Sequence, residues 1–347
     1  MKIPYGMLRI GYPYVKTVGM RVLTNAPINV VVGDDPNELH IICRLDSVVF
    51  IRRLTLDDED KGAFNLMGGS TATGDSKVKG EFIWPSAMVK NSTGHLLIVD
   101  EGTHKISKIT IEGEVISQWG VHGIQEGELD RPSGIALDRD GNIIVSDTMN
   151  HRIQKFTEDG AYQSGFGAFG DNPGQLNMPW GIDVDDDGNI YVADWRNDRI
   201  QKFDAEGNHL LTVGNGTGDT DGKFNRPSAV KIDKDGDIYV SDWGNHRIQL
   251  FGADGHFVEK FIGDATLSDQ ARGYMITNMV AMRLREMTSI EPQKRFRWPV
   301  SVTIHDDYMF VPDFGSCRIQ IYKKNVIRFS EGEIAERPRS NSLYTQF

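Results

Sequence analysis

Short apolar runs separated by polar turns recur along most of the chain. Within residues 131–156, the runs 134–137, 143–146 and 152–156 are separated by the Asp140-Gly141 turn and by the polar corner 147–151. Asp-Gly turns between β-branched runs are typical of antiparallel hairpins. The pattern predicts a small antiparallel meander, whose edges can be covered only by further copies of itself.

Copies of this meander are present at a regular interval. The prolines that open the second to fifth copies, Pro85, Pro132, Pro179 and Pro227, lie 47, 47 and 48 residues apart. A weaker first copy opens at Pro27 and a sixth at Pro299. An aspartate ends the middle run of five copies, and we call these the marker aspartates: Asp100, Asp147, Asp194, Asp242 and Asp313. Arg44 takes their place in the first copy.

This period, with about four strands per copy, favours a β-propeller over a helical solenoid. We therefore expect an all-β fold with six four-stranded antiparallel blades. The repeated residues P-x-G-I, D-x-x-G-N-I-Y-V-x-D and N-x-R-I-Q-K-F resemble the NHL repeat over roughly residues 14 to 323. The resemblance implies a six-bladed propeller. Because NHL-like propellers serve as enzymes, RNA binders and protein scaffolds, it selects no function.

The remaining segments complete or interrupt the predicted ring. Residues 14–18 resemble the outermost strand of other copies and are expected to close the last blade, which gives a single propeller over 14–328. Residues 53–82 and 262–297 are predicted insertions. The second is expected to hold a short helix (about 265–290, with Ser268 as its N-cap) between blades 5 and 6, and to act as a lid or a solvated helix. Residues 329–347 are expected to form a polar tail.

Composition excludes several classes of protein. The formal charge of −11 argues against general affinity for nucleic acid. The two cysteines, Cys43 and Cys317, suit a reducing compartment, and no apolar run reaches the roughly 18 residues of a membrane span. We therefore expect a cytoplasmic protein without membrane contact.

The candidate site lies on one face of the predicted propeller. In a four-stranded meander the tight turns share one face, whereas corners such as 147–151 and the connections before each proline share the other, here called the corner face. Variable loops on a rigid framework carry most binding residues, which favours the corner face. Its predicted catalytic residues are Arg131, Arg226 and Asp147. Its predicted ligand-binding residues are Trp84, Met149, Met178, Trp180, Trp195, Trp243, Trp298 and Phe314.

Each group also has a structural alternative. Single tryptophans often wedge between blades, and an aspartate at a corner commonly caps the turn. The repeated histidines His104, His151 and His246 are expected to bridge neighbouring strands. The run 165–170 matches the glycine spacing of a dinucleotide site, but no helix follows it, so no dinucleotide is expected. No metal ligands are identified, and a divalent metal in the central channel is left open.

Three functions remain open. An aromatic mouth with guanidinium groups suits a planar or anionic organic ligand, so the first is a small-molecule-binding propeller, an enzyme of the lyase or hydrolase type. The alternative is a scaffold that binds a protein or peptide on the same face. RNA binding ranks last because the chain is acidic.

Overall fold

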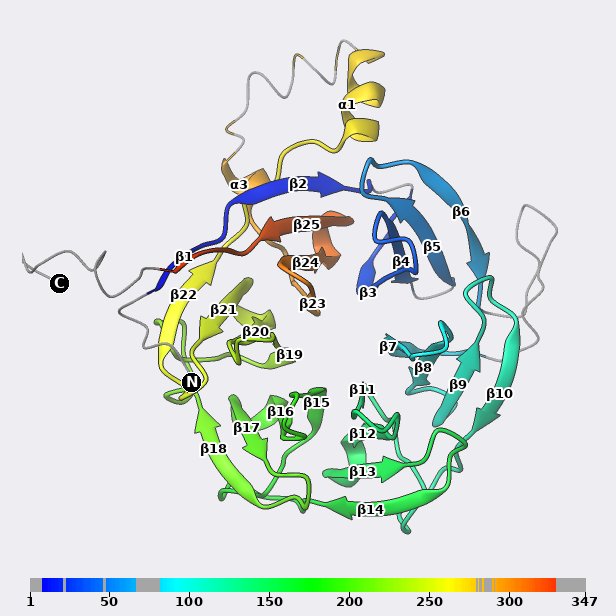
Figure 1. Ribbon diagram of the computed structural model, residues 1–347. Coiled ribbons are helices and arrows are strands. Elements are labelled where there is room, and N and C mark those ends of the chain that lie inside the picture. Colours follow the sequence, from blue (N-terminus) through cyan, green and yellow to red (C-terminus); the bar gives the residue numbers. More distant parts are fainter. Residues whose placement is uncertain are drawn as a thin grey trace, which may run out of the picture.

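Six blades form a closed ring around a central channel in the computed structural model (Figure 1). The structure describes residues 8–20, 23–45, 48–66, 82–278, 280, 283, 289 and 291–328. Every blade is a four-stranded antiparallel sheet, so the six-bladed all-β fold predicted from the repeat is confirmed.

The first strand of each blade lines the channel and the fourth lies at the rim (Figure 1). Blades 1 to 3 are β3–β6 (Pro27–Val32, Glu38–Arg44, Val49–Thr55, Asp60–Asn65), β7–β10 (Pro85–Lys90, Leu96–Asp100, Lys105–Ile109, Val115–Trp119) and β11–β14 (Gly134–Leu137, Ile143–Asp147, Arg152–Phe156, Tyr162–Phe166). Blades 4 to 6 are β15–β18 (Pro179–Val184, Ile190–Asp194, Arg199–Phe203, His209–Val213), β19–β22 (Pro227–Ile232, Ile238–Asp242, Arg247–Phe251, Phe257–Phe261) and β23–β25 (Thr303–His305, Tyr308–Asp313, Arg318–Lys323) with β2 (Tyr14–Val18).

The core lies between the blades rather than within one of them. All residues of the second strands β8, β12, β16 and β20 are buried, because each of these strands is covered on both faces. One apolar cluster, for example, joins Ile144 and Ile153 of blade 3 to Ile182 and Val192 of blade 4. Alternating β-branched residues fill such inter-blade layers well. Each blade is therefore stabilised mainly by its two neighbours.

The marker aspartates hold the corners. Asp147 is fully buried, and its Oδ1 accepts the backbone N–H of Asp130 at 2.7 Å. Its Oδ2 accepts hydrogen bonds from Asn150, Arg152 and Gln154 at 2.9, 2.7 and 3.0 Å. Asp194 and Asp242 repeat this arrangement. Short 3₁₀ turns follow four of the markers: η2 Thr148–Asn150, η3 Trp195–Asn197, η4 Trp243–Asn245 and η5 Phe314–Ser316.

The repeated histidines connect neighbouring blades, not only neighbouring strands. The Nδ1 of His104 accepts the backbone N–H of Arg131 in the next blade at 3.0 Å. His151 and His246 do the same for Met178 and Trp298, at 3.0 and 3.1 Å. Burial lowers the pKa of His104 and His151, which keeps Nδ1 free to accept.

The ring closes through strands from opposite ends of the sequence. β2 pairs antiparallel with β25 as the outer strand of blade 6, and β1 (Leu8–Gly11) pairs with β26 (Asn325–Arg328). Lys324, between β25 and β26, places its Nζ 2.5, 2.9 and 2.8 Å from carboxylate oxygens of Asp233, Asp235 and Asp237 in blade 5. This ion-pair cluster ties the closing strands to the β19–β20 turn.

Two predicted insertions differ from expectation. Residues 53–65 belong to blade 1, because β5 runs to Thr55 and β6 follows it, and residues 67–81 lie outside the described chain. In the second insertion, α1 (Asp269–Ile276) begins after Ser268, whose side chain accepts the backbone N–H of Ala271 at 3.2 Å as expected of an N-cap. Most of the predicted helix beyond 278, and the tail 329–347, lie outside the described residues.

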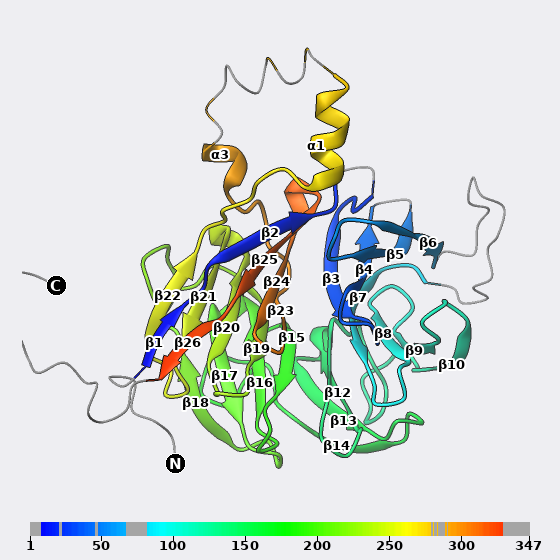
Figure 2. The ribbon, with the colours of Figure 1, turned by 45° about the horizontal axis from the view of Figure 1, so that its top comes forward.

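The described part of the second insertion stands at the rim of the ring. Asp58 of blade 1 accepts the backbone N–H of Gln270 at 2.8 Å and so fixes the start of α1 there. α1 and α3 (Glu291–Lys294) lie outside the ring of strands beside β2 (Figures 1 and 2). This described part therefore lies beside the ring of strands, and a lid or a solvated helix stays a prediction for the insertion as a whole. No helix in the described part of the chain is long and apolar enough to cross a membrane.

Candidate functional site

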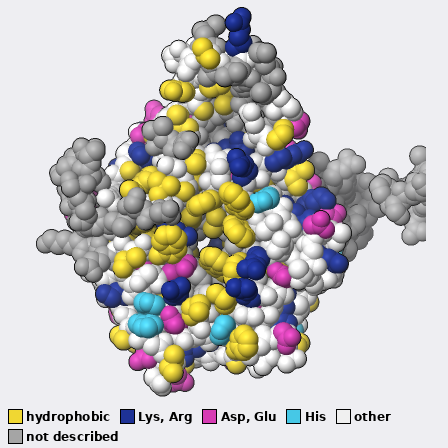
Figure 3. All heavy atoms as spheres, turned by 180° about the vertical axis from the view of Figure 1, so that it is seen from behind, with side chains coloured by type: hydrophobic (Ala, Val, Ile, Leu, Met, Phe, Trp, Pro, Cys, Tyr) yellow, Lys and Arg dark blue, Asp and Glu magenta, His cyan; other side chains and the backbone are white. Residues whose placement is uncertain are grey.

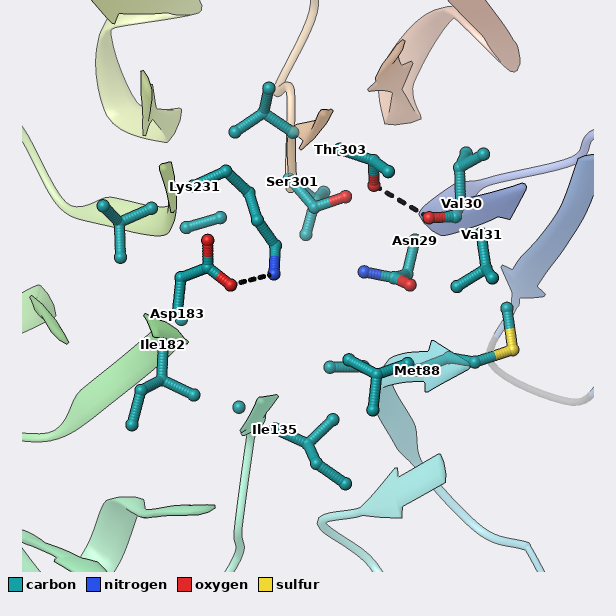
Figure 4. Close-up of a pocket in the computed structure, with 18 of the residues that line it drawn as sticks. Asn29, Val30, Val31, Met88, Ile135, Ile182, Asp183, Lys231, Ser301 and Thr303 are labelled. Atoms are coloured by element: carbon teal, nitrogen blue, oxygen red, sulfur yellow. Dashed lines mark hydrogen bonds and ion pairs between the residues drawn. The ribbon is translucent and has the colours of Figure 1, made fainter. Parts of the chain in front are cut away.

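The channel holds a cavity of about 390 Å³ lined by the inner strands of all six blades. Its walls combine apolar side chains such as Ile135 and Ile182 with polar ones, among which Lys231 pairs with Asp183 at 2.6 Å (Figure 4). The Asn29 amide points into the channel, and its buried Oδ1 has no hydrogen-bond partner among the described residues. Of the predicted site residues, Trp180 is the one that lines this cavity.

Figure 3 shows the corner face, where hydrophobic side chains surround the opening of the channel and Lys, Arg and His side chains lie among them. The residue after each marker aspartate lies close to this opening, because the marker itself pairs with the proline at the start of the inner strand. Pro85 pairs with Asp100, and Pro27 pairs with Cys43 in the same way. Cys43, not Arg44, therefore takes the place of the marker in blade 1, and the expectation for Arg44 was wrong by one residue.

The six positions after the marker form what we call the mouth ring. Two of its members form hydrogen bonds with the start of the next inner strand. Arg44 donates from Nη1 to the Pro85 carbonyl at 2.9 Å, and Thr148 donates from Oγ1 to the Pro179 carbonyl at 2.7 Å. The ring is polar in blades 1 to 3 and aromatic in blades 4 to 6. Its members, in blade order, are Arg44, Glu101, Thr148, Trp195, Trp243 and Phe314.

The aromatic half brings several predicted residues together. Trp180 and Trp195 meet edge to face with ring centroids 5.2 Å apart. The guanidinium of Arg226 lies over Trp195 at 4.5 Å, and that of Arg196 at 5.0 Å. The Trp195 Nε1 is buried without a hydrogen-bond partner among the described residues. A side chain at position 134 would collide with the Trp180 carbonyl, so Gly134 allows the two blades to approach closely here.

The polar half contains residues that the sequence did not indicate. The Arg44 guanidinium lies 4.3 Å above the Trp84 ring. Burial raises the pKa of the Glu101 carboxyl to about 7, although the charges of Arg44 and Arg131 act in the opposite direction. The Glu101 Oε1 is buried and has no hydrogen-bond partner among the described residues. A carboxyl group with such a pKa can both take and give a proton near neutral pH.

The other predicted residues divide between the opening and the framework. Asp147 is enclosed, and its two oxygens accept four hydrogen bonds, so we assign it to the corner rather than to chemistry. Arg131 and Met149 are exposed on the corner face, and Met178 is half-buried beside His151. Trp298 packs edge to face on His246 at 5.6 Å.

Trp243 and Phe314 belong to the mouth ring and are both half-buried, and Phe314 also packs against the core between blades 1 and 2. The repeat pattern held an overlooked signal for Glu101, whereas the position of Arg44 follows only from the strand pairing. When the copies are aligned on strand register, the position after the marker carries a cation, an acid and a hydroxyl in three blades, and an aromatic ring in the other three.

Comparisons with known proteins identify the repeats and the fold. The NHL repeat model matches residues 129–156, 176–203 and 224–251. No curated protein matches the chain significantly. Among solved structures, a catalytically inactive virginiamycin B lyase from Staphylococcus aureus with quinupristin is 13% identical, with a TM-score of 0.56 over 91% of this chain and 99% of that one.

Two further structures give similar values. A streptogramin B lyase is 13% identical, with a TM-score of 0.53 over 92% of this chain and 98% of that one. A structural genomics protein of unknown function from Bacteroides thetaiotaomicron VPI-5482 is 13% identical, with a TM-score of 0.59 over 92% and 76%. At such identity the likeness concerns the fold alone. The chain contains three NHL repeats and is built as a six-bladed β-propeller.

Proposed function

We propose that the protein binds a small organic ligand at the mouth ring and acts on it as a lyase-type enzyme. The observation that carries this proposal is that two residues of the mouth ring hold buried polar atoms without partners among the described residues, the Glu101 acceptor and the Trp195 donor. Native proteins satisfy nearly all such groups, because an unpaired buried polar atom costs about 1 to 3 kcal/mol. A ligand seated in the opening would supply the missing partners.

The chemistry of the opening defines the class of ligand. Trp180, Trp195 and the Arg226 guanidinium offer faces and edges for a planar group. Arg44 and Arg131, near Glu101, favour an anionic or carbonyl group at the polar half. The ligand would therefore have an aromatic or apolar body at blades 4 to 6 and an acceptor at blades 1 to 3.

Glu101 would act as acid and base in this proposal. Its carboxylate takes a proton from carbon, the C–H electron pair forms a double bond, and the leaving atom departs with its own electron pair. The protonated carboxyl then returns the proton to that atom, so no water is consumed. Virginiamycin B lyase indicates that a propeller of this kind can host a lyase, but it lends no residue role to this chain.

Protein binding is the second candidate. Val121, Ile124 and Phe169, in the connections between blades, are 65%, 71% and 65% exposed. Exposed large apolar residues on a rigid face are typical of protein interfaces. An Ile124→Asp variant should lose such a partner and keep the small ligand, which separates the two functions.

Tryptophan fluorescence tests the proposed site directly. We expect indole-3-acetate or 2-naphthoate to quench the wild-type protein saturably, and Trp195→Phe to lose most of that change. Trp119→Phe is the matched control, because Trp119 packs on Phe156 at 4.8 Å in the rim strand β10. Isothermal titration calorimetry should show at least about tenfold weaker binding for Trp195→Ala.

The proposal has a clear negative result. If Trp195→Phe and Trp119→Phe respond equally to both probes, the ligand does not sit at the mouth ring. If binding survives but Glu101→Gln changes neither affinity nor turnover of a bound substrate, the acid–base role of Glu101 is wrong.

A further inference from the structure

We propose that His104, His122 and Asp130 bind a divalent transition-metal ion, for which Zn²⁺ is the model, at the junction of blades 2 and 3. One ligand atom from each residue lies within 4.8 Å of the other two. His104 ends the corner of blade 2, and the other two residues lie in the connection between β10 and β11. The cluster is on the corner face and is separate from the mouth ring.

The distances within the cluster suit tetrahedral coordination. The His104 Nδ1 and the His122 Nε2 each lie 3.5 Å from Oδ1 of Asp130. The two imidazole rings lie close together, with centroids 4.2 Å apart. Bonds of about 2.0 to 2.1 Å in a tetrahedral site place neighbouring ligand atoms roughly 3.4 Å apart. Small side-chain movements would therefore complete the site and leave one position open to water or a ligand.

The repeat shows that the fold does not require this cluster. The connection bridge His122–Leu129 has equivalents in Phe169–Leu176 and Thr217–Phe224 at the next two junctions. The matching trios there are His151, Phe169 and Asn177, and Asp198, Thr217 and Asn225. They form the same local structure without the full set of ligands. His122 and Asp130 are thus departures from the repeat, and the His122 side chain is 63% exposed rather than packed.

The ligand set indicates the kind of ion. Two imidazole nitrogens and one carboxylate suit Zn²⁺, Ni²⁺ or Cu²⁺. Ca²⁺ and Mg²⁺ prefer sites made of oxygen atoms. A structural zinc site would normally have four protein ligands, so three ligands indicate an exchangeable ion or one that takes part in binding.

Metal binding must compete with the bridge to Arg131. In the neutral ring, the Nδ1 that accepts the Arg131 N–H carries no proton, so the proton lies on Nε2. An ion on Nδ1 would displace the Arg131 N–H. An ion on Nε2 would move the proton to Nδ1, which could then no longer accept. Either way Arg131, held at a φ of 47°, is released from its partner, which couples the ion to a residue near Glu101.

Calorimetric titration of the intact protein with ZnCl₂ tests the site. We expect one ion per chain, and at least about tenfold weaker binding in His122→Ala and in Asp130→Asn. His151→Ala is the matched control and should leave the zinc affinity unchanged. His104→Ala is less informative because it also removes a bridge between blades.

The next junction offers a gain-of-function test. Phe169→His combined with Asn177→Asp places the same three ligand types around His151, and the number of zinc ions per chain should rise from one to two. Zinc binding that is equal in wild type, His122→Ala and Asp130→Asn would mean that the ion binds elsewhere and would overturn the proposal, as would the absence of binding in the wild type. These outcomes are independent of whether an organic ligand binds at the mouth ring.

Discussion

At the scale of single residues, Glu101 is the side chain whose environment departs most from what its type prefers. It follows Asp100 at a tight corner. There the loss of water on burial disfavours the charged carboxylate more than two nearby guanidinium groups favour it. Desolvation therefore outweighs Coulombic attraction, and the proton is retained to about pH 7. The mouth ring thus holds a carboxyl group whose charged form would be more stable in water. Such groups are typical of functional sites.

The raised pKa makes stability depend on pH in a defined direction. The pKa of Glu101 in the folded protein, about 7, exceeds its ordinary value of 4.5, so the folded state holds an extra proton between these values. Stability due to this group is complete below about pH 4.5 and is lost as the pH rises through 7. Glu101→Gln should therefore stabilise the protein by about 1 to 3 kcal/mol at pH 8 and by much less at pH 5.

Chemical denaturation of both proteins at the two pH values measures this difference. Glu126→Gln, at an exposed position in the connection between β10 and β11, serves as the control for the substitution itself. An equal effect of Glu101→Gln at pH 5 and pH 8 would mean that the carboxyl is ionised normally.

The residues of the mouth ring illustrate what the sequence could and could not indicate. Trp195 and Trp243 stood out because tryptophan is rare, whereas Glu101 and Arg44 are common residue types in a charged chain. Arg44 was also assigned to the wrong position, because blade 1 has Cys43 in place of a marker aspartate and its register is visible only in the strand pairing. Burial, which gives Glu101 its unusual pKa, has no local sequence pattern.

At the scale of elements, the corner is a small network built around one buried anion. Four of the five marker aspartates receive a backbone N–H and two or three side-chain donors, as Asp147 does, whereas Asp100 accepts four backbone N–H groups. Charge-assisted hydrogen bonds of this kind are strong and directional. They fix the 3₁₀ turn whose first residue belongs to the mouth ring, so the framework determines where the variable residue points.

Asp147→Asn should destabilise the protein by about 2 to 4 kcal/mol. The new amide would place an N–H₂ group among donors from Asn150, Arg152 and Gln154 and leave at least one of them unpaired. Asp140→Asn, in the exposed turn between β11 and β12, is the control and should change stability by less than about 0.5 kcal/mol. Normal stability of Asp147→Asn combined with lost activity would instead return Asp147 to a catalytic role.

Elements with a strong repeat were predictable, and those without it were not. The turns and strands of blades 2 to 5 could be predicted from the spacing of the prolines, turns and marker aspartates, because each copy shows the same pattern. The strand β6 was mistaken for part of an insertion, since DKGAFN at Asp60–Asn65 has little of the apolar alternation seen in other copies. The placement of α1 at the rim depends on contacts of Gln270 with Asp58, far away in sequence, which no local pattern reveals.

At the scale of the whole molecule, β2 makes the ring a single cooperative unit. Val18 is fully buried in the cluster that joins blade 6 to blade 1, together with Val30, Leu39 and Ile319. Lys324 adds a link from the same region to three carboxylates of blade 5. Without these contacts two sheet edges would be open, and open edges invite pairing with other chains.

Val18→Ala should lower the free energy of unfolding by about 1 to 3 kcal/mol, because it removes buried apolar atoms at the point of closure. Val15→Ala in the same strand is the matched control, since Val15 is 42% exposed and should contribute little. Urea denaturation followed by circular dichroism gives both values. If the two variants are equally stable, β2 does not contribute to closure in the way that its packing indicates.

The pairing of β2 with β25 can form only late in synthesis, because the two strands are far apart in the sequence. Val18 emerges from the ribosome 300 residues before Arg318, the first residue of its partner strand. At a translation rate of roughly 5 to 20 residues per second, β2 waits about 15 to 60 seconds for a partner. Blades 2 to 5 can assemble during that interval, but the last blade cannot. The nascent protein therefore carries its two open edges throughout this interval, when they are most exposed to neighbouring nascent chains.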